Sequence, residues 1–240
     1  MGAARQMRLT AAHIDRVRRV VADPGWVGVL PFRPATGEDH VAVVDRLMAV
    51  APPGGEVWVF AYGSLIWNPA FDFVEKRVGT VAGWHRAFCL GWDRRFRGNA
   101  EQPALMLALD RGGSCRGVVF RLPPEGLSAN LVRLVRREMS THPSPFPARW
   151  VSATTASGPV RAISFAINRK SVRYVAGVSE AAIADALATA VGFRGSMAEY
   201  LHATVTHLEA AGIHDPYLWR LQEMVAERIE RATGMAMEMH

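Results

Sequence analysis

The apolar positions of this chain change period at about residue 55. Residues 10–22 place valine and isoleucine on one helical face after Thr10, and residues 37–50 repeat a helical pattern. A stretch rich in proline and glycine at 51–55 then interrupts the chain. We therefore expect residues 1–55 to form a helical N-terminal extension and residues 56–235 to form a separate main domain.

Strand-like runs follow this boundary. Short segments rich in β-branched and aromatic residues alternate with turn residues, which is typical of strands. The segment 110–114 contains two glycines and is interpreted as a hairpin connection. The expected strands span residues 56–62, 77–91 with a bend at Gly83, 104–110, 115–122, 149–155 and 159–167.

Helical patterns dominate the last third of the chain, after one earlier helix within the strand region. They span 128–141 from a Ser128 cap, 179–191 from Ser179, 196–211, and 216–232 with Asp215 as cap and Pro216 at the first position. Because the helices are segregated from the strands, the pattern predicts an α+β fold. We expect its mixed or antiparallel sheet to curl into a β-barrel with surrounding helices.

Composition places the chain among ordinary globular proteins. It has 240 residues, of which 50% are hydrophobic and 21% charged. No apolar run approaches the roughly 18–20 residues that cross a bilayer, and no secretory signal is evident. With two cysteines, Cys89 and Cys115, a disulfide framework is excluded, and both are expected to be buried free thiols. We expect a cytoplasmic protein without a membrane partner.

The net charge of +6 raises the question of nucleic-acid binding. The charge comes mostly from arginines spread along the chain, and no zinc-finger spacing, RNP-like strand or basic tail accompanies them. We therefore expect no nucleic-acid partner and favour an anionic small molecule. Nucleic-acid binding through the arginine surface stays open as an alternative, which salt-sensitive retention on heparin would support.

One carboxylate occupies a position where the helical period predicts an apolar residue. Glu138 follows Leu134 by four residues and Val135 by three, so it lies on the buried face of the predicted 128–141 helix. Desolvating a carboxylate costs several kcal/mol unless it is paired or protonated. One explanation is an internal ion pair with Arg86 or Arg137. The other is a general base whose pKa is raised by burial.

A second feature is the apolar run Val57–Trp67, which breaks at Gly63 and Ser64. This pattern is typical of a buried strand that ends in a tight turn. Successive backbone amides in such a turn can converge on an anion, although an ordinary turn explains the same residues.

Other kinds of site find no support in the sequence. Ser64 is not surrounded by a Gly-x-Ser-x-Gly elbow, and no Gly-x-Gly-x-x-Gly or P-loop pattern occurs. His202 and His207 are five residues apart, so they do not share a helical face. We expect no metal and no cofactor.

Four segments in order carry a resemblance to a known family. They are Tyr62–Trp67, Gly83–Phe88, Cys115–Pro123 and Arg136–Met139. With them the chain resembles the ChaC-type, glutathione-specific γ-glutamylcyclotransferases over roughly residues 56–211. The resemblance implies the γ-glutamylcyclotransferase-like fold in a catalytic domain, and a lyase that cleaves glutathione to 5-oxoproline and cysteinylglycine.

The resemblance also implies roles for individual residues. Glu138 matches the family's catalytic glutamate. The chain departs from the family at Ala61, where glycine is common, and in the loop 140–145, which has no tyrosine. This departure concerns the dipeptide end of the pocket more than the chemistry. The implied substrate-binding residues are Tyr62, Gly63, Ser64 and Leu65 in the turn, together with Tyr174 and Tyr200.

Two further hypotheses stay open beside this one. The same fold can act on other γ-glutamyl amines or γ-glutamyl amino acids. A non-catalytic protein can use the barrel pocket to bind a small ligand, although a binder would gain stability from leucine or methionine at position 138. In each case the partner is a small molecule, and the sequence leaves the oligomeric state open.

Overall fold

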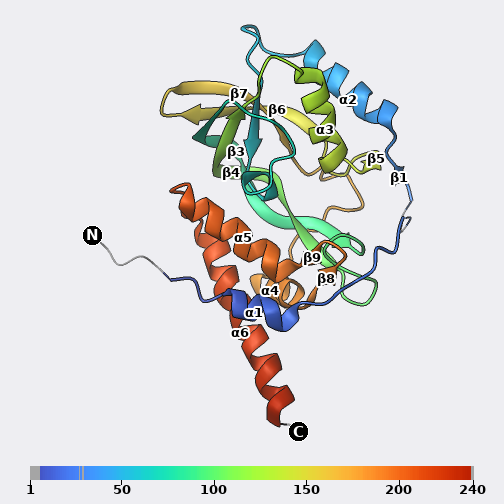
Figure 1. The fold of residues 1–240 in the computed structure, drawn as a ribbon, viewed down its shortest axis with the longest axis vertical. Helices are drawn as coiled ribbons and strands as arrows, with labels where there is room; N and C mark the ends of the chain where they lie inside the picture. The colour runs from blue at the N-terminus through green and yellow to red at the C-terminus, as the bar shows by residue number, and fades with distance from the viewer. Residues whose placement is uncertain (1–5, 27, 29, 239–240) are drawn as a thin grey trace. The chain divides into compact units, whose positions relative to one another are not determined.

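A barrel of five strands is the central feature of the computed structural model, which describes residues 6–26, 28 and 30–238. Around the barrel the strand order is β2 (Trp58–Ala61), β4 (Ala104–Arg121), β3 (Glu75–Asp93), β6 (Ala148–Thr155) and β7 (Gly158–Phe165). Figure 1 shows these strands with the chain coloured from the N-terminus to the C-terminus. The predicted α+β class and the mixed barrel are confirmed.

Strand β2 is the most deeply buried of the barrel strands. All four of its residues are buried, which explains why this run is continuously apolar instead of alternating. It pairs in antiparallel fashion with β4, from Trp58 opposite Arg121 to Ala61 opposite Val118. On its other edge it pairs in parallel with β7, and this contact closes the barrel.

The expected hairpin at 110–114 is wrong. Residues 104–121 form one continuous strand, β4, and the chain reverses instead in the segment 94–103 between β3 and β4. Gly112 and Gly113 have φ values of 105° and 64°, which only glycine adopts readily, and the strand continues through both of them. Gly83, where a bend is expected, has a φ of 78° within the continuous strand β3.

The chain forms two compact units. The first contains residues 1–27, 91–106 and 175–240, and the second contains 28–90 and 107–174. The predicted domain boundary between residues 55 and 56 falls inside the second unit. Residues 28–55 therefore pack with the barrel residues of that unit.

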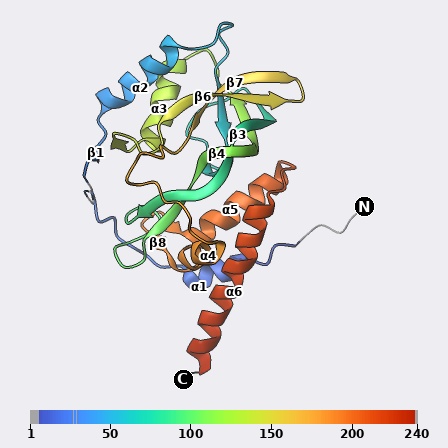
Figure 2. The same cartoon turned by 180° about the vertical axis from the view of Figure 1, so that it is seen from behind.

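Two helices and a small sheet accompany the barrel residues of the second unit. Helix α2 (Gly37–Ala49) starts at a Thr36–Asp39 capping box and packs beside α3 (Leu127–Glu138), as Figures 1 and 2 show. Strand β1 (Arg33–Pro34) pairs with β5 (Thr141–His142). Helix α3 begins after Gly126 instead of at Ser128, and it ends at Glu138, three residues earlier than expected.

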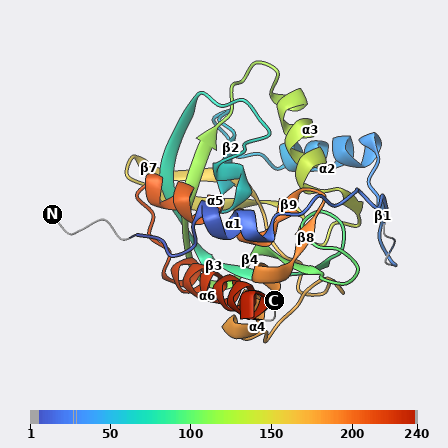
Figure 3. The same cartoon turned by 60° about the horizontal axis from the view of Figure 1, so that its bottom comes forward.

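The first unit is mainly helical, as Figure 3 shows. Helix α6 (Pro216–Glu238) packs against α1 (Ala11–Val17), α4 (Glu180–Thr189) and α5 (Met197–Ala210), and a small hairpin is made by β8 (Val191–Gly192) and β9 (Gly195–Ser196). The predicted caps Ser179 and Asp215 each accept a backbone amide of the helix that follows. Cys89 and Cys115 are free and buried, as expected. Within the described residues, no helix combines the length and apolarity that a membrane crossing requires.

Gly117 marks the closest approach of β4 to β2. A Cβ atom at this position would lie 2.7 and 2.8 Å from two ring carbons of Phe60, and it would also collide with the Ala61 carbonyl oxygen. We expect Gly117→Ala to lower the free energy of unfolding by about 1–3 kcal/mol, because neither the buried ring nor the backbone has room to move. Urea denaturation would measure the change.

Gly37→Ala is the matched control, since a Cβ atom there meets nothing within 4 Å. It should change the free energy of unfolding by no more than about 0.5 kcal/mol. Equal stability of the two variants would contradict the close packing of β4 on β2.

Candidate active site

The chain turns sharply where β2 ends. After Ala61 it passes through Tyr62 and Gly63 into a short 3₁₀ helix, η1 (Ser64–Ile66). The hydrogen bonds of this helix begin with the Ile66 amide, which donates to the Gly63 carbonyl at 2.9 Å. The Ser64 and Leu65 amides precede that first bond, as the leading N–H groups of a helix do. The predicted turn is therefore present, with two amides ahead of the helical hydrogen bonds.

Arg86, on β3, fixes the backbone of this turn. Its side chain is buried, with the residue 6% exposed. The Nε atom donates to the Tyr62 carbonyl at 2.7 Å, and a terminal nitrogen donates to the Arg116 carbonyl on β4. A buried guanidinium requires acceptors, and these carbonyls supply them. The turn is thus linked to β3, which carries Arg86, and through Arg86 to β4.

Glu138 is the last residue of α3. Its side chain is 17% exposed, and Leu134 and Val135 on the same face are fully buried. The helix ends there because Met139 leaves the helical conformation, with φ −112° and ψ 71°. The predicted position of Glu138 on the buried face is confirmed.

Arg137 connects the Glu138 carboxylate to the turn. Its Nε atom lies 3.2 Å from Oε1 of Glu138, and one terminal nitrogen donates to the Ser64 hydroxyl oxygen at 3.2 Å. Its other terminal nitrogen donates to the Asn68 carbonyl just after η1. Glu138 is therefore ion-paired with Arg137, which is one of the two explanations given for a carboxylate on the buried face. The same arginine also contacts the turn.

The electrostatic environment makes Glu138 a stronger base than an ordinary glutamate. Burial raises the pKa of its carboxyl, and the neighbouring Arg137 charge lowers it in part. The location at the carboxyl end of α3 acts in the same direction as burial, because the negative end of the helix dipole disfavours an anion. The net effect is a raised pKa of the Glu138 carboxyl.

Asn130 fastens α3 to the chain that follows the turn. Its amide group accepts a hydrogen bond from the Asp72 amide and donates one to the Asp72 carbonyl, both at 2.9 Å. The sequence does not single out Asn130 as a site residue by motif. Its helical position does, because Asn130 precedes Leu134 by four residues and Glu138 by eight and so lies on the same buried face.

Known proteins are similar to this chain over a region that includes both the turn and Glu138. A family model described as ChaC-like protein matches residues 57–228. This chain belongs to the ChaC family. A glutathione-specific gamma-glutamylcyclotransferase of Escherichia coli K12 is 39% identical over 181 residues, which cover 75% of this chain and 77% of that protein.

More distant members of the ChaC family are also similar. Human glutathione-specific gamma-glutamylcyclotransferase 1 is 29% identical over 168 residues, covering 65% of this chain and 71% of the human protein. The crystal structure of a glutathione-specific cyclotransferase from yeast superimposes with a TM-score of 0.64 at 19% identity, covering 72% of this chain and 96% of the yeast chain. That likeness supports the fold.

Tyr174 takes part in a second polar network of the same unit. Its hydroxyl donates to Asp110 Oδ2 at 2.9 Å, and Arg169 donates to Oδ1 at 2.6 Å. Burial and the Asp110 charge raise the pKa of the Tyr174 phenol, so it stays protonated. Its described contacts involve neither the turn nor Glu138, and its ChaC-family role in binding substrate stays a prediction.

Tyr200 belongs to the first unit. It is a buried residue of α5, and the Arg97 guanidinium lies 5.8 Å from its ring centroid. Arg97 also pairs with Glu199 at 2.9 Å. These contacts are structural, and the role of Tyr200 in binding substrate stays a prediction.

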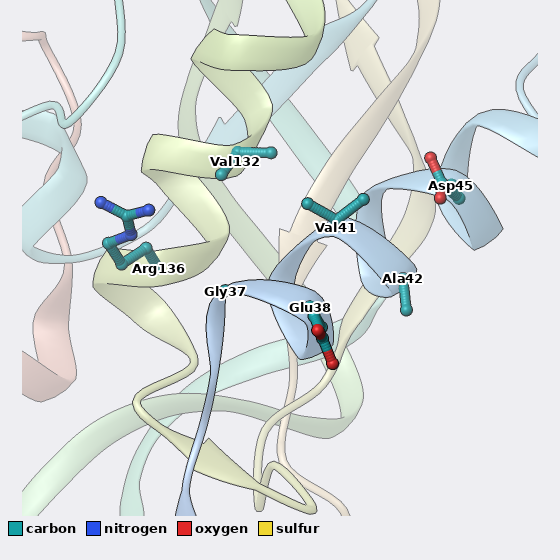
Figure 4. Close-up of a pocket in the computed structure, with 7 residues that line it drawn as sticks. All are labelled: Gly37, Glu38, Val41, Ala42, Asp45, Val132 and Arg136. Atoms are coloured by element: carbon teal, nitrogen blue, oxygen red, sulfur yellow. The ribbon is translucent and has the colours of Figure 1, made fainter.

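A surface groove of about 600 Å³ lies between α2 and α3, and its lining contains neither Glu138 nor the residues of the turn. Figure 4 shows its lining, with Val41 on α2 and Val132 and Arg136 on α3. Arg136 precedes Glu138 by two residues, which is roughly half a helical turn, so the groove and the carboxylate occupy different faces of α3. Among the described residues, no group of three His, Cys, Asp or Glu side chains is placed to hold a metal ion.

The effect of Arg137 on Glu138 can be measured directly. We expect the Glu138 carboxyl of the wild-type protein to titrate above the roughly 4.3 of an unperturbed glutamate. Arg137→Met should raise this pKa further, because it removes the charge that favours the ionised form. NMR titration of the side-chain carboxyl carbons would give both values.

Glu180 serves as the internal control in the same spectra. Its pKa is lowered by hydrogen bonds from Arg220, so it should titrate below the ordinary value in both proteins. A Glu138 pKa that falls in Arg137→Met would contradict the assigned electrostatics.

Proposed function

We propose that this ChaC-family protein is a glutathione-specific γ-glutamylcyclotransferase that converts glutathione to 5-oxoproline and cysteinylglycine. The observation that carries the proposal is the Arg137 guanidinium, which contacts both the Glu138 carboxylate and the Ser64 hydroxyl. It brings a buried base next to the turn that resembles the family's γ-glutamyl-binding loop. The names of the bacterial and human relatives supply the substrate.

The proposed reaction is intramolecular. The α-amine nitrogen of the γ-glutamyl group attacks its own γ-carbonyl carbon, and a five-membered lactam forms. The bond between that carbon and the cysteine nitrogen breaks, which releases cysteinylglycine. Since nucleophile and electrophile belong to one molecule, the protein has to fold the substrate and move protons.

Glu138 moves the proton that starts the reaction in this scheme. As a carboxylate it removes a proton from the α-ammonium group, and as a carboxylic acid it gives that proton to the departing cysteine nitrogen. The attacking nitrogen loses a second proton to solvent as the lactam forms, and the released amine of cysteinylglycine takes one up from solvent. A raised pKa suits both steps, because the group must exchange its proton near neutral pH. The balance of the reaction requires no net proton uptake.

The turn holds the glutamyl end of the substrate in this proposal. The amides of Gly63, Ser64 and Leu65 bind the anionic or carbonyl oxygens, and the same donors stabilise the oxyanion that develops on the γ-carbonyl. Tyr62 belongs to the same turn, and the Arg86 bond to its carbonyl keeps the backbone in place before substrate arrives. Pre-organised donors of this kind need no rearrangement during the reaction.

The remaining assignments complete the proposal. Tyr174 and Tyr200 are assigned to substrate binding on the resemblance. The partner is glutathione, and the reaction is placed in the cytoplasm, which suits two free thiols. No cofactor enters the scheme.

Glutathione cleavage is the direct test. Incubating the purified protein with glutathione should yield 5-oxoproline and cysteinylglycine in equal amounts, as chromatography with mass detection would show. A panel of other γ-glutamyl amines and γ-glutamyl amino acids should give a much lower kcat/KM. Preferred turnover of one of those compounds would reject glutathione specificity, and the absence of 5-oxoproline from every compound would reject the activity.

Glu138→Gln should lower kcat by at least about 100-fold, because an amide cannot accept the proton. The folded state should be as stable as the wild type at neutral pH, or more so. The folded-state pKa of Glu138 is raised, so ionising this group opposes folding above its unfolded pKa. Steady-state kinetics and thermal unfolding would measure both effects.

Glu125→Gln is the matched control, because Glu125 is an exposed glutamate just before α3. It should keep wild-type kcat. A fully active Glu138→Gln protein would reject the role of Glu138 as the base.

A further inference from the structure

The segment from Arg33 to Ala49 precedes the residues matched by the family model, which begin at residue 57. We propose that this segment is part of the catalytic unit, and that His40 is a positioning residue that holds the end of α3 where Glu138 lies. The proposal rests on the proposed function of Glu138. It gives a function to residues 33–49, which lie outside the four segments that carry the family resemblance.

The backbone directly after Glu138 is bound by this N-terminal segment. Strand β1 pairs with β5 in a register that sets Arg33 opposite His142 and Pro34 opposite Thr141. The Ala35 amide also donates to the Ser140 carbonyl at 3.0 Å. Three consecutive residues after Met139 therefore have backbone partners in the segment 33–35.

His40 fixes the first residue after Glu138. Its Nε2 atom lies 3.1 Å from the Met139 carbonyl oxygen, and the residue is 6% exposed. The last carbonyls of a helix have no partner within the helix, so they need donors from elsewhere. A carbonyl can only accept, so Nε2 carries the proton and donates. The imidazole thus satisfies a carbonyl at the end of α3.

The other ring nitrogen of His40 has no partner among the described residues, so the bond to Met139 comes with one unsatisfied buried atom. His40 Nδ1 is buried and has no hydrogen-bond partner in the described part of the chain. A buried polar atom without a partner costs about 1–3 kcal/mol. An apolar side chain of similar size would avoid that cost, but it would leave the Met139 carbonyl without its donor. We infer that position 40 is a histidine because its Nε2 atom orients the Met139 carbonyl.

Glu138 is consequently held from both sides along the chain. The residue before it, Arg137, contacts Ser64 and Asn68, and the residue after it, Met139, is bound by His40. A displacement of about 1 Å in a catalytic group can cost on the order of 100-fold in rate. Loss of the His40 bond should therefore appear in kcat and leave substrate binding largely intact.

Helix α2 also provides a matched control. Near its C-terminal end, the Leu47 carbonyl accepts a hydrogen bond from Trp150 Nε1 at 2.9 Å. This bond, like that of His40, joins a ring N–H to a backbone carbonyl and fastens α2 to the rest of the unit. It joins α2 to β6 and involves neither Glu138 nor Met139, so its loss tests the effect of loosening α2.

The experiment compares His40→Leu, His40→Gln and Trp150→Phe with the wild type, using kcat and KM for glutathione. We expect His40→Leu to lower kcat by about 10- to 100-fold while KM changes by less than about twofold. His40→Gln should recover most of the rate, because its amide nitrogen can donate from the position of Nε2. Trp150→Phe should keep wild-type kcat although it also loses a hydrogen bond of α2.

The carboxyl ¹³C chemical shift of Glu138 gives a readout that does not require turnover. It should move in His40→Leu, return toward the wild-type value in His40→Gln, and stay unchanged in Trp150→Phe. Wild-type kcat in His40→Leu, equal loss of kcat in the leucine and glutamine variants, or an equal loss in Trp150→Phe would overturn the positioning role. A wild-type protein that releases no 5-oxoproline would instead reject the proposed function, and the chemical shifts would still test whether His40 holds Glu138.

Discussion

The arrangement of the site depends on one guanidinium group. Arg137 contacts the Glu138 carboxylate, the Ser64 hydroxyl and the Asn68 carbonyl. Glu138 ends helix α3, Ser64 begins η1, and Asn68 follows η1. Burial raises the pKa of this carboxyl, and the Arg137 charge lowers it in part. The guanidinium therefore favours the ionised carboxylate, while burial strengthens it as a base. The same bonds set the distance between base and turn.

The local features of the fold could be predicted from the sequence, whereas strand continuity could not. Helix starts follow from caps such as Ser179 and Asp215, whose side chains act on amides only three residues away. Gly112 and Gly113 resemble a turn in the sequence, but their positive φ values occur inside a strand that is held by its neighbours in the barrel. Local composition does not show which strand lies beside another, so that interpretation failed.

The site shows the same division between local pattern and long-range contact. Helical periodicity alone places Glu138 on the buried face, because the period is a property of adjacent residues. It does not distinguish Arg86 from Arg137 as partner, since that choice depends on where β3 lies. The structure assigns Arg86 to the Tyr62 carbonyl and Arg137 to the carboxylate. Asn130 was visible in the same periodicity, but its partner Asp72 is 58 residues away in the chain.

The N-terminal segment shows why composition is a weak guide to which residues pack together. Residues 51–55 have the composition of a linker, yet residues 28–55 pack in the same unit as α3. Helix α3 ends at Glu138, so its final carbonyls have to be satisfied by another part of the chain. Here that part is α2, through His40 and the Met139 carbonyl. Under the proposed function of Glu138, the donor that caps this helix terminus belongs to the site, although it lies 99 residues away in the chain.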